Sequence, residues 1–196
     1  MNQSLNASFW DERYREKRMG WDIGYASPPL THYIDRITDK SKRILIPGAG
    51  NSYEAEYLWG REFKNVTVLD WSRSALQNFK KRLPEFPEAQ LRNEDFFKHS
   101  GSYDLILEQT FFCALPPEKR PDYVRKMAEL LADDGELTGV LFSVLLFEDH
   151  PPFGGSEEEY RTLFAPHLEL IKMEPCYNSI PERAGNELFF IARKRR

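Results

Sequence analysis

RILIPGAGNSYEAEYL, residues 43–58, carries the pattern that decides the fold of this chain. A short apolar run stops at a Pro-Gly-Ala-Gly turn, and a helix-like stretch follows in which Ser52 can serve as the N-cap. Gly48 and Gly50 would let the backbone approach a ligand closely, and the helix behind them would present free N–H groups to it. A tight strand-to-helix turn also favours glycine for steric reasons, so the turn alone leaves ligand binding open.

The alternation of strand and helix continues from this stretch to the C-terminus. Strands are predicted over residues 43–47, 65–70, 89–93, 103–109, 135–144, 168–175 and 187–194, and helices over 52–61, 72–83, 117–132 and near 156–164. This order predicts an α/β fold with a doubly wound, mostly parallel, Rossmann-like seven-stranded sheet and helices on both of its faces.

Length and composition predict one domain over residues 1–196, and they argue against binding to nucleic acid and against insertion into a membrane. A chain of 196 residues with 41% hydrophobic content can bury one sizeable core. The 27 Lys and Arg against 31 Asp and Glu give a net charge of -4, which argues against a nucleic-acid-binding surface. The longest apolar stretch, 137–147, has about half the length that a membrane-spanning helix needs, so we interpret it as a buried strand.

The N-terminus and the cysteines indicate the cellular compartment. The start MNQSLNASFWDERY lacks a basic segment followed by an apolar core, so we expect no signal peptide and a cytoplasmic protein. Cys113 and Cys176 are the only cysteines, and neither lies in a CxxC or His-rich pattern. We therefore expect neither a disulfide framework nor a metal site.

Two acids near the ends of later strands add to the signal of the glycine turn. Asp70 ends the second predicted strand, where a carboxylate can accept hydrogen bonds from both hydroxyls of a ribose. The alternative is a helix-capping acid before Ser72. In NEDFF, residues 93–97, Asp95 can accept from the exocyclic amine of adenine while the N–H of Phe96 donates to a ring nitrogen. The alternative there is a loop acid beside core phenylalanines.

The residue after the turn separates two classes of nucleoside cofactor. Dinucleotide sites generally show G-x-G-x-x-G, and the third glycine lies where the helix crosses the strand. Tyr53 occupies that position here. The sequence therefore favours S-adenosylmethionine, with a nicotinamide-dependent oxidoreductase and a non-catalytic cofactor-binding subunit as alternatives.

Five longer segments carry a family resemblance: FWDERYREKRMGWDIGYASPPL (9–30), LIPGAGNSYEAEYL (45–58), NEDFF (93–97), YDLILEQTFFCALPPEKRPDYVRKMAELLADDGEL (103–137) and NSIPERAGNELFFIARK (178–194). They resemble the class I S-adenosylmethionine-dependent methyltransferases, and within them the thiopurine S-methyltransferase group that includes the plant halide and thiol methyltransferases. The second and third segments are generic to class I, whereas the first segment, TFFCALPPEKR and SIPERAGNE are typical of the narrower group.

The resemblance implies a division of the chain and a set of cofactor contacts. Residues 1–40 would form an N-terminal helical lid and its following helix, and residues 43–196 the Rossmann-like core. The implied contacts are Trp10, Tyr14 and Trp21 in the lid, Gly48 and Gly50 at the amino-acid end, Asp70 at the ribose, Asp95 and Phe96 at the adenine, and Gln109 nearby. Aromatic faces attract a sulfonium cation by roughly 0.5 to 2 kcal/mol each, and the alternative is an aromatic stripe that docks an N-terminal helix onto the core.

The segment after the fourth predicted strand bears on the methyl acceptor. It lacks the Asn/Asp-Pro-Pro-Tyr motif that orients an amine in many relatives and reads EQTFF, residues 108–112. The apolar candidates for an acceptor pocket are Phe111, Phe112, Phe142 and Phe153, and Cys113 is interpreted as a buried small residue. A dry pocket lowers the barrier when an anion attacks a sulfonium, because charge disappears in the transition state. Each phenylalanine can also be explained by core packing.

No obvious general base accompanies these phenylalanines. Asp149 and His150 could assist deprotonation, or they are solvated loop residues. A thiol with a pKa of roughly 8.5 supplies some thiolate at neutral pH without help. We therefore predict methyl transfer to the sulfur of a small thiol or bisulfide, or to a halide ion, with another small molecule as the alternative acceptor. We expect a monomer that binds neither nucleic acid nor a membrane.

Overall fold

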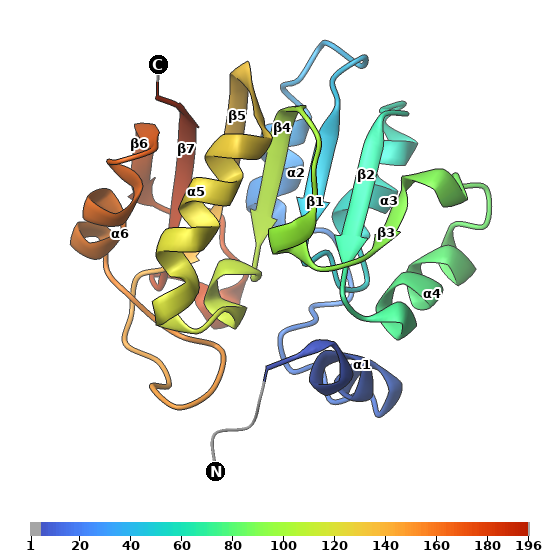
Figure 1. Ribbon diagram of the computed structural model, residues 1–196, viewed down its shortest axis with the longest axis horizontal. Helices are drawn as coiled ribbons and strands as arrows, with labels where there is room; N and C mark the ends of the chain where they lie inside the picture. Colours follow the sequence, from blue (N-terminus) through green and yellow to red (C-terminus); the bar gives the residue numbers. More distant parts are fainter. Residues whose placement is uncertain (1–4, 196) are drawn as a thin grey trace.

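The computed structural model describes residues 5–195, so residues 1–4 and 196 of the predicted single domain lie outside the described residues (Figure 1). The helices are α1 (Ala7–Arg15), α2 (Pro28–Ile34), α3 (Tyr53–Gly60), α4 (Arg73–Arg82), α5 (Arg120–Leu130) and α6 (Glu157–Phe164). The strands are β1 (Ile44–Pro47), β2 (Val66–Asp70), β3 (Leu91–Asn93), β4 (Tyr103–Gln109), β5 (Leu131–Phe142), β6 (Leu168–Pro175) and β7 (Glu187–Lys194). Within the described residues, no helix is both long and apolar enough to cross a membrane.

The seven strands form one sheet in the order β3-β2-β1-β4-β5-β7-β6. The pairings from β3 through β5 are parallel, whereas β7 is antiparallel to both β5 and β6. The sheet is therefore mixed, and the expectation of a mostly parallel sheet is corrected. A parallel pair needs a long crossover, usually a helix, and the segment 176–186 between β6 and β7 contains only the 3-10 turn η5 (Pro181–Arg183).

Alternate strand residues supply two hydrophobic cores, one on each face of the sheet. In β1, Ile44 and Ile46 belong to the core under α2, α3 and α4, whereas Leu45 belongs to the core under α5 and α6. This division follows from the two-residue period of side chains in a strand. Helices therefore cover both faces, as predicted (Figure 1).

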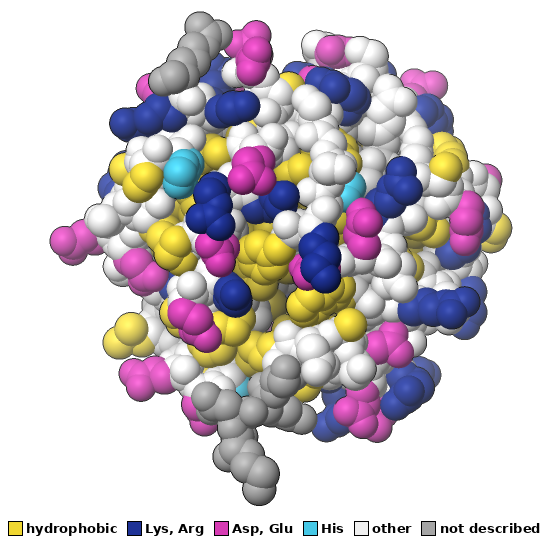
Figure 2. Space-filling model, viewed as in Figure 1, with side chains coloured by type: hydrophobic (Ala, Val, Ile, Leu, Met, Phe, Trp, Pro, Cys, Tyr) yellow, Lys and Arg dark blue, Asp and Glu magenta, His cyan; other side chains and the backbone are white. Residues whose placement is uncertain are grey.

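The carboxyl ends of β1, β2 and β4 meet at one edge of the sheet, and α1 lies beside this edge (Figure 1). The strand order reverses between β1 and β4, which is the place where open α/β sheets bind ligands. Hydrophobic side chains gather near the middle of the face in Figure 2, and charged side chains surround them. The fold therefore brings the glycine turn, Asp70 and Gln109 to one edge.

The two predicted serine caps behave differently. Ser72 caps α4, since its Oγ accepts from the N–H of Ala75 at 3.1 Å. Ser52 precedes α3 as expected, but its side chain makes no capping bond. Its φ of 58° is left-handed, and its hydroxyl donates to the carbonyl of Gly50 at 3.2 Å. The Ser52 hydroxyl therefore bonds to the glycine turn before it and not to α3.

Candidate functional site

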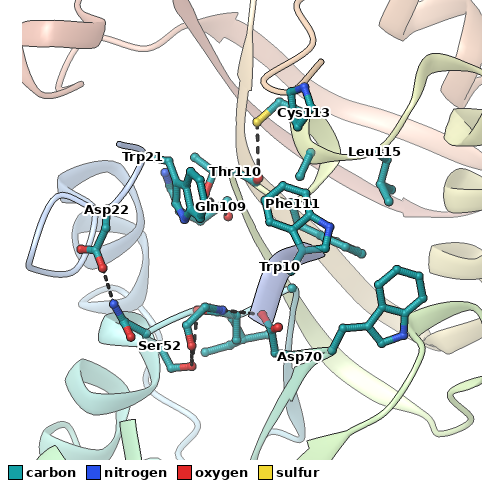
Figure 3. A pocket seen from close by; sticks show the side chains of 18 of the residues that line it. Trp10, Trp21, Asp22, Ser52, Asp70, Gln109, Thr110, Phe111, Cys113 and Leu115 are labelled. Carbon is teal, nitrogen blue, oxygen red and sulfur yellow. Dashed lines mark hydrogen bonds between the residues drawn. The ribbon is translucent and has the colours of Figure 1, made fainter. Parts of the chain in front are cut away.

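A cavity of about 450 Å³ opens at the carboxyl ends of β1, β2 and β4 (Figure 3). The residues expected to contact the cofactor all line it: Trp10, Tyr14, Trp21, Gly48, Gly50, Asp70, Asp95, Phe96 and Gln109. The fold thus gathers residues from the N-terminal segment, three strand ends and the NEDFF loop around one space. Their individual contacts with a cofactor stay predictions.

Asp70 is a buried acid whose two oxygens both accept from backbone donors. Its Oδ2 accepts from the N–H of Gly50 and its Oδ1 from the N–H of Ser72, each at 2.7 Å. Burial, helped by the charge of Asp11, raises the pKa of Asp70 to about 6 although these two bonds lower it. Each carboxylate oxygen keeps a second lone pair for another donor. Asp70 therefore holds the glycine turn and the start of α4 together by hydrogen bonds. It can still accept a hydrogen bond from a ribose hydroxyl.

The glycine turn has a left-handed backbone that is packed against aromatic side chains. The φ angles of Gly48 and Gly50 are 56° and 54°, values that a residue with a Cβ adopts only with strain. A Cβ on Gly48 would overlap the ring of Phe111, and a Cβ on Gly50 would overlap the hydroxyl of Tyr14. The steric explanation that the sequence left open therefore applies at both glycines.

The three aromatic residues of the N-terminal segment pack on one another at the edge of the cavity. The ring centroid of Trp21 lies 5.5 Å from that of Trp10 and 5.9 Å from that of Tyr14. The indole N–H of Trp21 donates to the Tyr14 hydroxyl at 3.3 Å, and burial raises the pKa of that hydroxyl. The neighbouring Asp22 accepts from the amide of Asn51 in the glycine turn. The segment is thus bound to the core by packing and hydrogen bonds.

The NEDFF loop, where the sequence predicts the adenine contacts, lines the cavity with Asp95 and Phe96. Asp95 is the N-cap of the 3-10 helix η2 (Phe96–Lys98), because its Oδ1 accepts from the N–H of Phe97 at 3.0 Å. The side chain of Phe96 is buried, and its ring centroid lies 5.1 Å from that of Phe111. The alternative of a loop acid beside a core phenylalanine therefore describes these side chains, and both residues still line the cavity.

The four acceptor-pocket candidates divide into two pairs. Phe111 and Phe142 line the cavity. Phe112 and Phe153 are only 1% and 4% exposed and lie outside its lining. The ring of Phe112 packs against Tyr123 and Tyr160 in the core. In the turn after β4, Phe111 thus faces the cavity, and its neighbour Phe112 faces the core.

Glu108, which sequence reasoning did not select, holds this turn in place. It is fully buried, and its Oε1 accepts from the N–H groups of Phe111 and Phe112 at 2.8 and 2.9 Å. Its Oε2 accepts from the hydroxyl of Tyr123 at 2.6 Å. Burial raises the pKa of Glu108 to about 7 despite these bonds. The turn includes Thr110 at a φ of 58°, which is strained for a β-branched residue. An acid directly after the apolar run Leu105–Leu107 was the signal in the sequence that could have identified Glu108.

Arg183 lines the cavity and was also missed by sequence reasoning. It comes from η5, its Nη2 donates to the carbonyl of Trp21 at 2.8 Å, and its guanidinium lies 5.8 Å from the ring centroid of Phe142. Its partner Glu187 is 3.6 Å away. Arg183 therefore brings a cation to the side of the cavity where Phe142 lies. It belongs to the SIPERAGNE segment, and a charged residue in a segment typical of the narrower group was the available signal.

The candidate bases that line the cavity are carboxylates, those of Asp22, Glu54, Asp70, Glu94 and Asp95. In the part of the chain that the structure describes, no histidine and no lysine lines it. His150 and Asp149 are exposed, and the imidazole Nε2 lies 3.7 Å from the Asp149 carboxylate. Cys113 does line the cavity, but its thiol donates to the carbonyl of Thr110 at 3.3 Å, and burial raises its pKa to about 12. The thiol is therefore protonated at neutral pH.

Gln109, at the end of β4, lines the cavity and has an unpaired amide oxygen. Its Oε1 is buried and has no hydrogen-bond partner among the described residues. A buried amide oxygen without a partner is costly, and a donor on a bound ligand or a water would satisfy it.

Comparisons with known proteins identify relatives along most of the chain. The family model described as Thiopurine S-methyltransferase (TPMT) matches residues 5–188. Thiocyanate methyltransferase 1 from Brassica oleracea is 30% identical over 191 residues, which cover 94% of this chain and 84% of the relative. Probable thiol methyltransferase 2 from Arabidopsis thaliana is 30% identical over 184 residues, which cover 91% and 81%.

A solved structure confirms the fold. The Burkholderia thailandensis 1,6-didemethyltoxoflavin-N1-methyltransferase, crystallised with S-adenosylhomocysteine, superposes with a TM-score of 0.77 over 97% of this chain and 87% of that chain. The sequence identity is 19%, so this likeness concerns the fold alone.

Proposed function

The chain belongs to the thiopurine S-methyltransferase family and is an S-adenosylmethionine-dependent methyltransferase, and from this premise we propose that it methylates the sulfur of a small thiol or of bisulfide, with halide ions as further acceptors. The observation that carries the proposal is the composition of the cavity near Phe111 and Phe142. Both rings and the guanidinium of Arg183 line it, and no histidine or lysine of residues 5–195 does. The carboxylates of the lining, those of Asp22, Glu54, Asp70, Glu94 and Asp95, come from other segments of the chain. Such a site suits an acceptor that arrives as an anion.

The cofactor would lie along the glycine turn. S-adenosylmethionine supplies an electrophilic methyl group on a sulfonium sulfur. Asp70 would accept from the ribose, the Gly48–Gly50 turn would face the amino-acid end, and the rings of Trp10, Tyr14 and Trp21 would attract the positive charge. The spare lone pairs of Asp70 and the unpaired Oε1 of Gln109 fit a ligand that carries hydroxyl and amine donors.

The chain would assist the reaction by orientation and by exclusion of water. When an anion attacks a sulfonium, opposite charges cancel, so water that solvates the separate charges raises the barrier. The rings of Phe111 and Phe142 would keep that region dry, and Arg183 would attract the anion through its charge. No base of the protein is needed, since a thiol with a pKa of roughly 8.5 is partly ionised at neutral pH.

The size of the cavity favours a small acceptor. Pockets for drug-sized ligands measure roughly 300–1,000 Å³, and this cavity of about 450 Å³ must hold S-adenosylmethionine as well as the acceptor. The names of the relatives point the same way, because thiocyanate and small thiols are soft sulfur nucleophiles. Halide ions enter the proposal because they are small anions that need no base.

The test is the pH dependence of kcat/KM for bisulfide, a small thiol, an aromatic thiol and iodide. We expect the small-thiol reaction to speed up with pH as thiolate forms. Iodide is ionised throughout, so its profile reports only the titration of the protein and serves as the matched control. The bulky aromatic thiol should be the poorest of the sulfur acceptors.

Two results would change the proposal. Efficient methylation of an amine or a hydroxyl, with none of the four acceptors used, would refute the sulfur and halide assignment. Turnover of the sulfur acceptors without iodide would restrict it to sulfur.

A further inference from the structure

Asp11, which lies next to Trp10 on α1, makes its hydrogen bonds to a different helix. Its Oδ1 accepts from the hydroxyl of Ser72 at 2.9 Å and from the N–H of Ser74 at 2.8 Å, both at the start of α4. The first N–H groups of a helix have no partner inside the helix, and the positive end of the helix dipole favours an anion there. Asp11 therefore docks α1 on α4 through an electrostatically favourable contact.

From Ser72 the hydrogen bonds continue to the glycine turn. Ser72 is fully buried, and its N–H donates to Asp70 while its hydroxyl donates to Asp11. The other oxygen of Asp70 accepts from the N–H of Gly50. Four residues in succession, Asp11, Ser72, Asp70 and Gly50, thus link α1 to the turn that borders the cavity.

A second contact between α1 and the turn lies one helical turn further along α1. The hydroxyl of Tyr14 packs directly on Gly50, so closely that a Cβ there would overlap it. Trp10 and Tyr14, which flank Asp11, both line the cavity. A shift of α1 away from α4 would therefore move both rings out of the cavity wall and remove the support that Asp11 gives to Ser72.

We propose that Asp11 is a positioning residue for S-adenosylmethionine: its bonds to Ser72 and Ser74 hold α1 in the docked position, so that docking of α1 and binding of the cofactor strengthen each other. Such coupling is reciprocal, because whatever docking adds to cofactor affinity, the cofactor adds to docking. The inference rests on the proposed placement of the cofactor against Asp70 and the glycine turn.

The experiment measures the affinity of the full chain for S-adenosylhomocysteine by calorimetry. The variants are Asp11→Asn, which keeps the shape without the charge, and Asp11→Ala. Glu12→Gln is the matched control, because Glu12 is the adjacent acid on α1 and its side chain makes no hydrogen bond among the described residues. The loss of a charge-assisted bond predicts a dissociation constant about tenfold higher for Asp11→Ala, a smaller rise for Asp11→Asn, and no change for Glu12→Gln.

Hydrogen exchange of peptides within residues 7–15 separates positioning from a general loss of stability. In the unaltered protein S-adenosylhomocysteine should slow exchange of α1, and in Asp11→Ala it should do so less, with exchange of the β4 and β5 strands unchanged. The KM for S-adenosylmethionine should rise with Asp11→Ala, with little change in kcat at saturation. Unchanged affinity, or weakened affinity accompanied by an equally faster exchange of the strands, would overturn the inference.

Asp70→Ala distinguishes the inference from the proposal beneath it. If the cofactor lies where we propose, this variant should bind S-adenosylhomocysteine about a hundredfold more weakly. Weak binding by Asp70→Ala together with normal binding by both Asp11 variants would refute the role of Asp11 alone. Normal binding by Asp70→Ala would refute the placement of the cofactor itself.

Discussion

Two buried carboxylates, Asp70 at the end of β2 and Glu108 near the end of β4, organise the edge of the sheet where the cavity lies. Each accepts backbone N–H groups of the turns that border the cavity. Burial raises the pKa of Asp70 to about 6 and that of Glu108 to about 7, so the ionised forms cost stability near neutral pH. The turns are thus held at a thermodynamic cost, as is common where the backbone is strained near a functional site.

Replacement of Glu108 should change how stability depends on pH. The pKa of Glu108 rises from 4.5 to about 7 on folding, so between these values the folded state binds more protons than the unfolded state. Its contribution to the free energy of unfolding is therefore fully present below pH 4.5 and is lost as the pH rises towards 7, by at most ~3 kcal/mol. Glu108→Gln keeps an oxygen for the Phe111 and Phe112 N–H groups and removes this loss.

Urea unfolding at pH 5 and pH 8 measures the effect. Glu108→Gln should lose less stability than the unaltered protein between these pH values, while Glu118→Gln, a matched change in the exposed 3-10 helix η4 (Pro117–Lys119), should behave like the unaltered protein. Asp70 titrates in both proteins, so the difference isolates Glu108. An equal slope with pH in all three proteins would contradict the assignment.

At the scale of elements, α1 and the following segment contribute to the cavity but not to either hydrophobic core. The earliest residue of the two core clusters is Leu30 in α2. The contacts of the N-terminal segment are local to the site: Asp11 to Ser72 and Ser74, Asp22 to Asn51, and Trp21 to Arg183. This separation of core and cavity wall is what a lid requires, and it makes the function of the segment testable.

Removal of residues 1–22 should leave a folded domain that has lost its activity. Both cores stay intact, so circular dichroism should show the α/β spectrum and a cooperative thermal transition. Without the rings of Trp10, Tyr14 and Trp21, S-adenosylhomocysteine should bind more weakly and water should enter, so turnover should fall to background. Removal of residues 1–4 alone, which keeps the cavity-lining Leu5 and the α1 N-cap Asn6, is the control and should keep activity. If the protein lacking residues 1–22 were fully active, Trp10, Tyr14 and Trp21 would serve only to pack the N-terminal segment against the core.

At the scale of the whole molecule, the two cores share one sheet and both reach the cavity. Ile46 comes from the core under α3, Leu69 and Phe96 come from the core under α5, and all three line the cavity. A ligand there contacts both halves of the fold at once. The molecule should therefore unfold as one cooperative unit, as expected for a single domain.

S-adenosylhomocysteine should raise the stability of this unit in a single step. At a concentration of 100 times its dissociation constant, a ligand that binds only the folded state adds ~2.7 kcal/mol to the free energy of unfolding. For a chain of 196 residues this corresponds to a rise in Tm of about 5–10 °C. Calorimetry should show one transition with and without ligand, and adenine alone is the control. Two separate transitions, of which only one moves, would contradict a single domain.

Much of the architecture could be predicted because it depends on neighbouring residues. Apolar runs of strand length, the glycines at the end of β1 and the serine cap of α4 are local patterns, and they predicted seven strands and helices on both faces. The ends of parallel strands in an open sheet lie together, so the sequence also indicated that the glycine turn and Asp70 would share one edge, and the family resemblance added Gln109.

The tertiary structure decided what depends on residues that are distant in the sequence. It decided the reversed direction of β7 and the burial of Phe112 beside the partly buried ring of Phe111. It also decided the contacts of Asp11 with Ser72 and of Trp21 with Arg183, which join positions up to 162 residues apart. Local periodicity carries no information on which distant partner a side chain meets, because strand direction and side-chain contacts are selected by the packing of the complete core. The sequence by itself thus determined the elements and the place of the site, and only the folded chain determined which side chains form its walls.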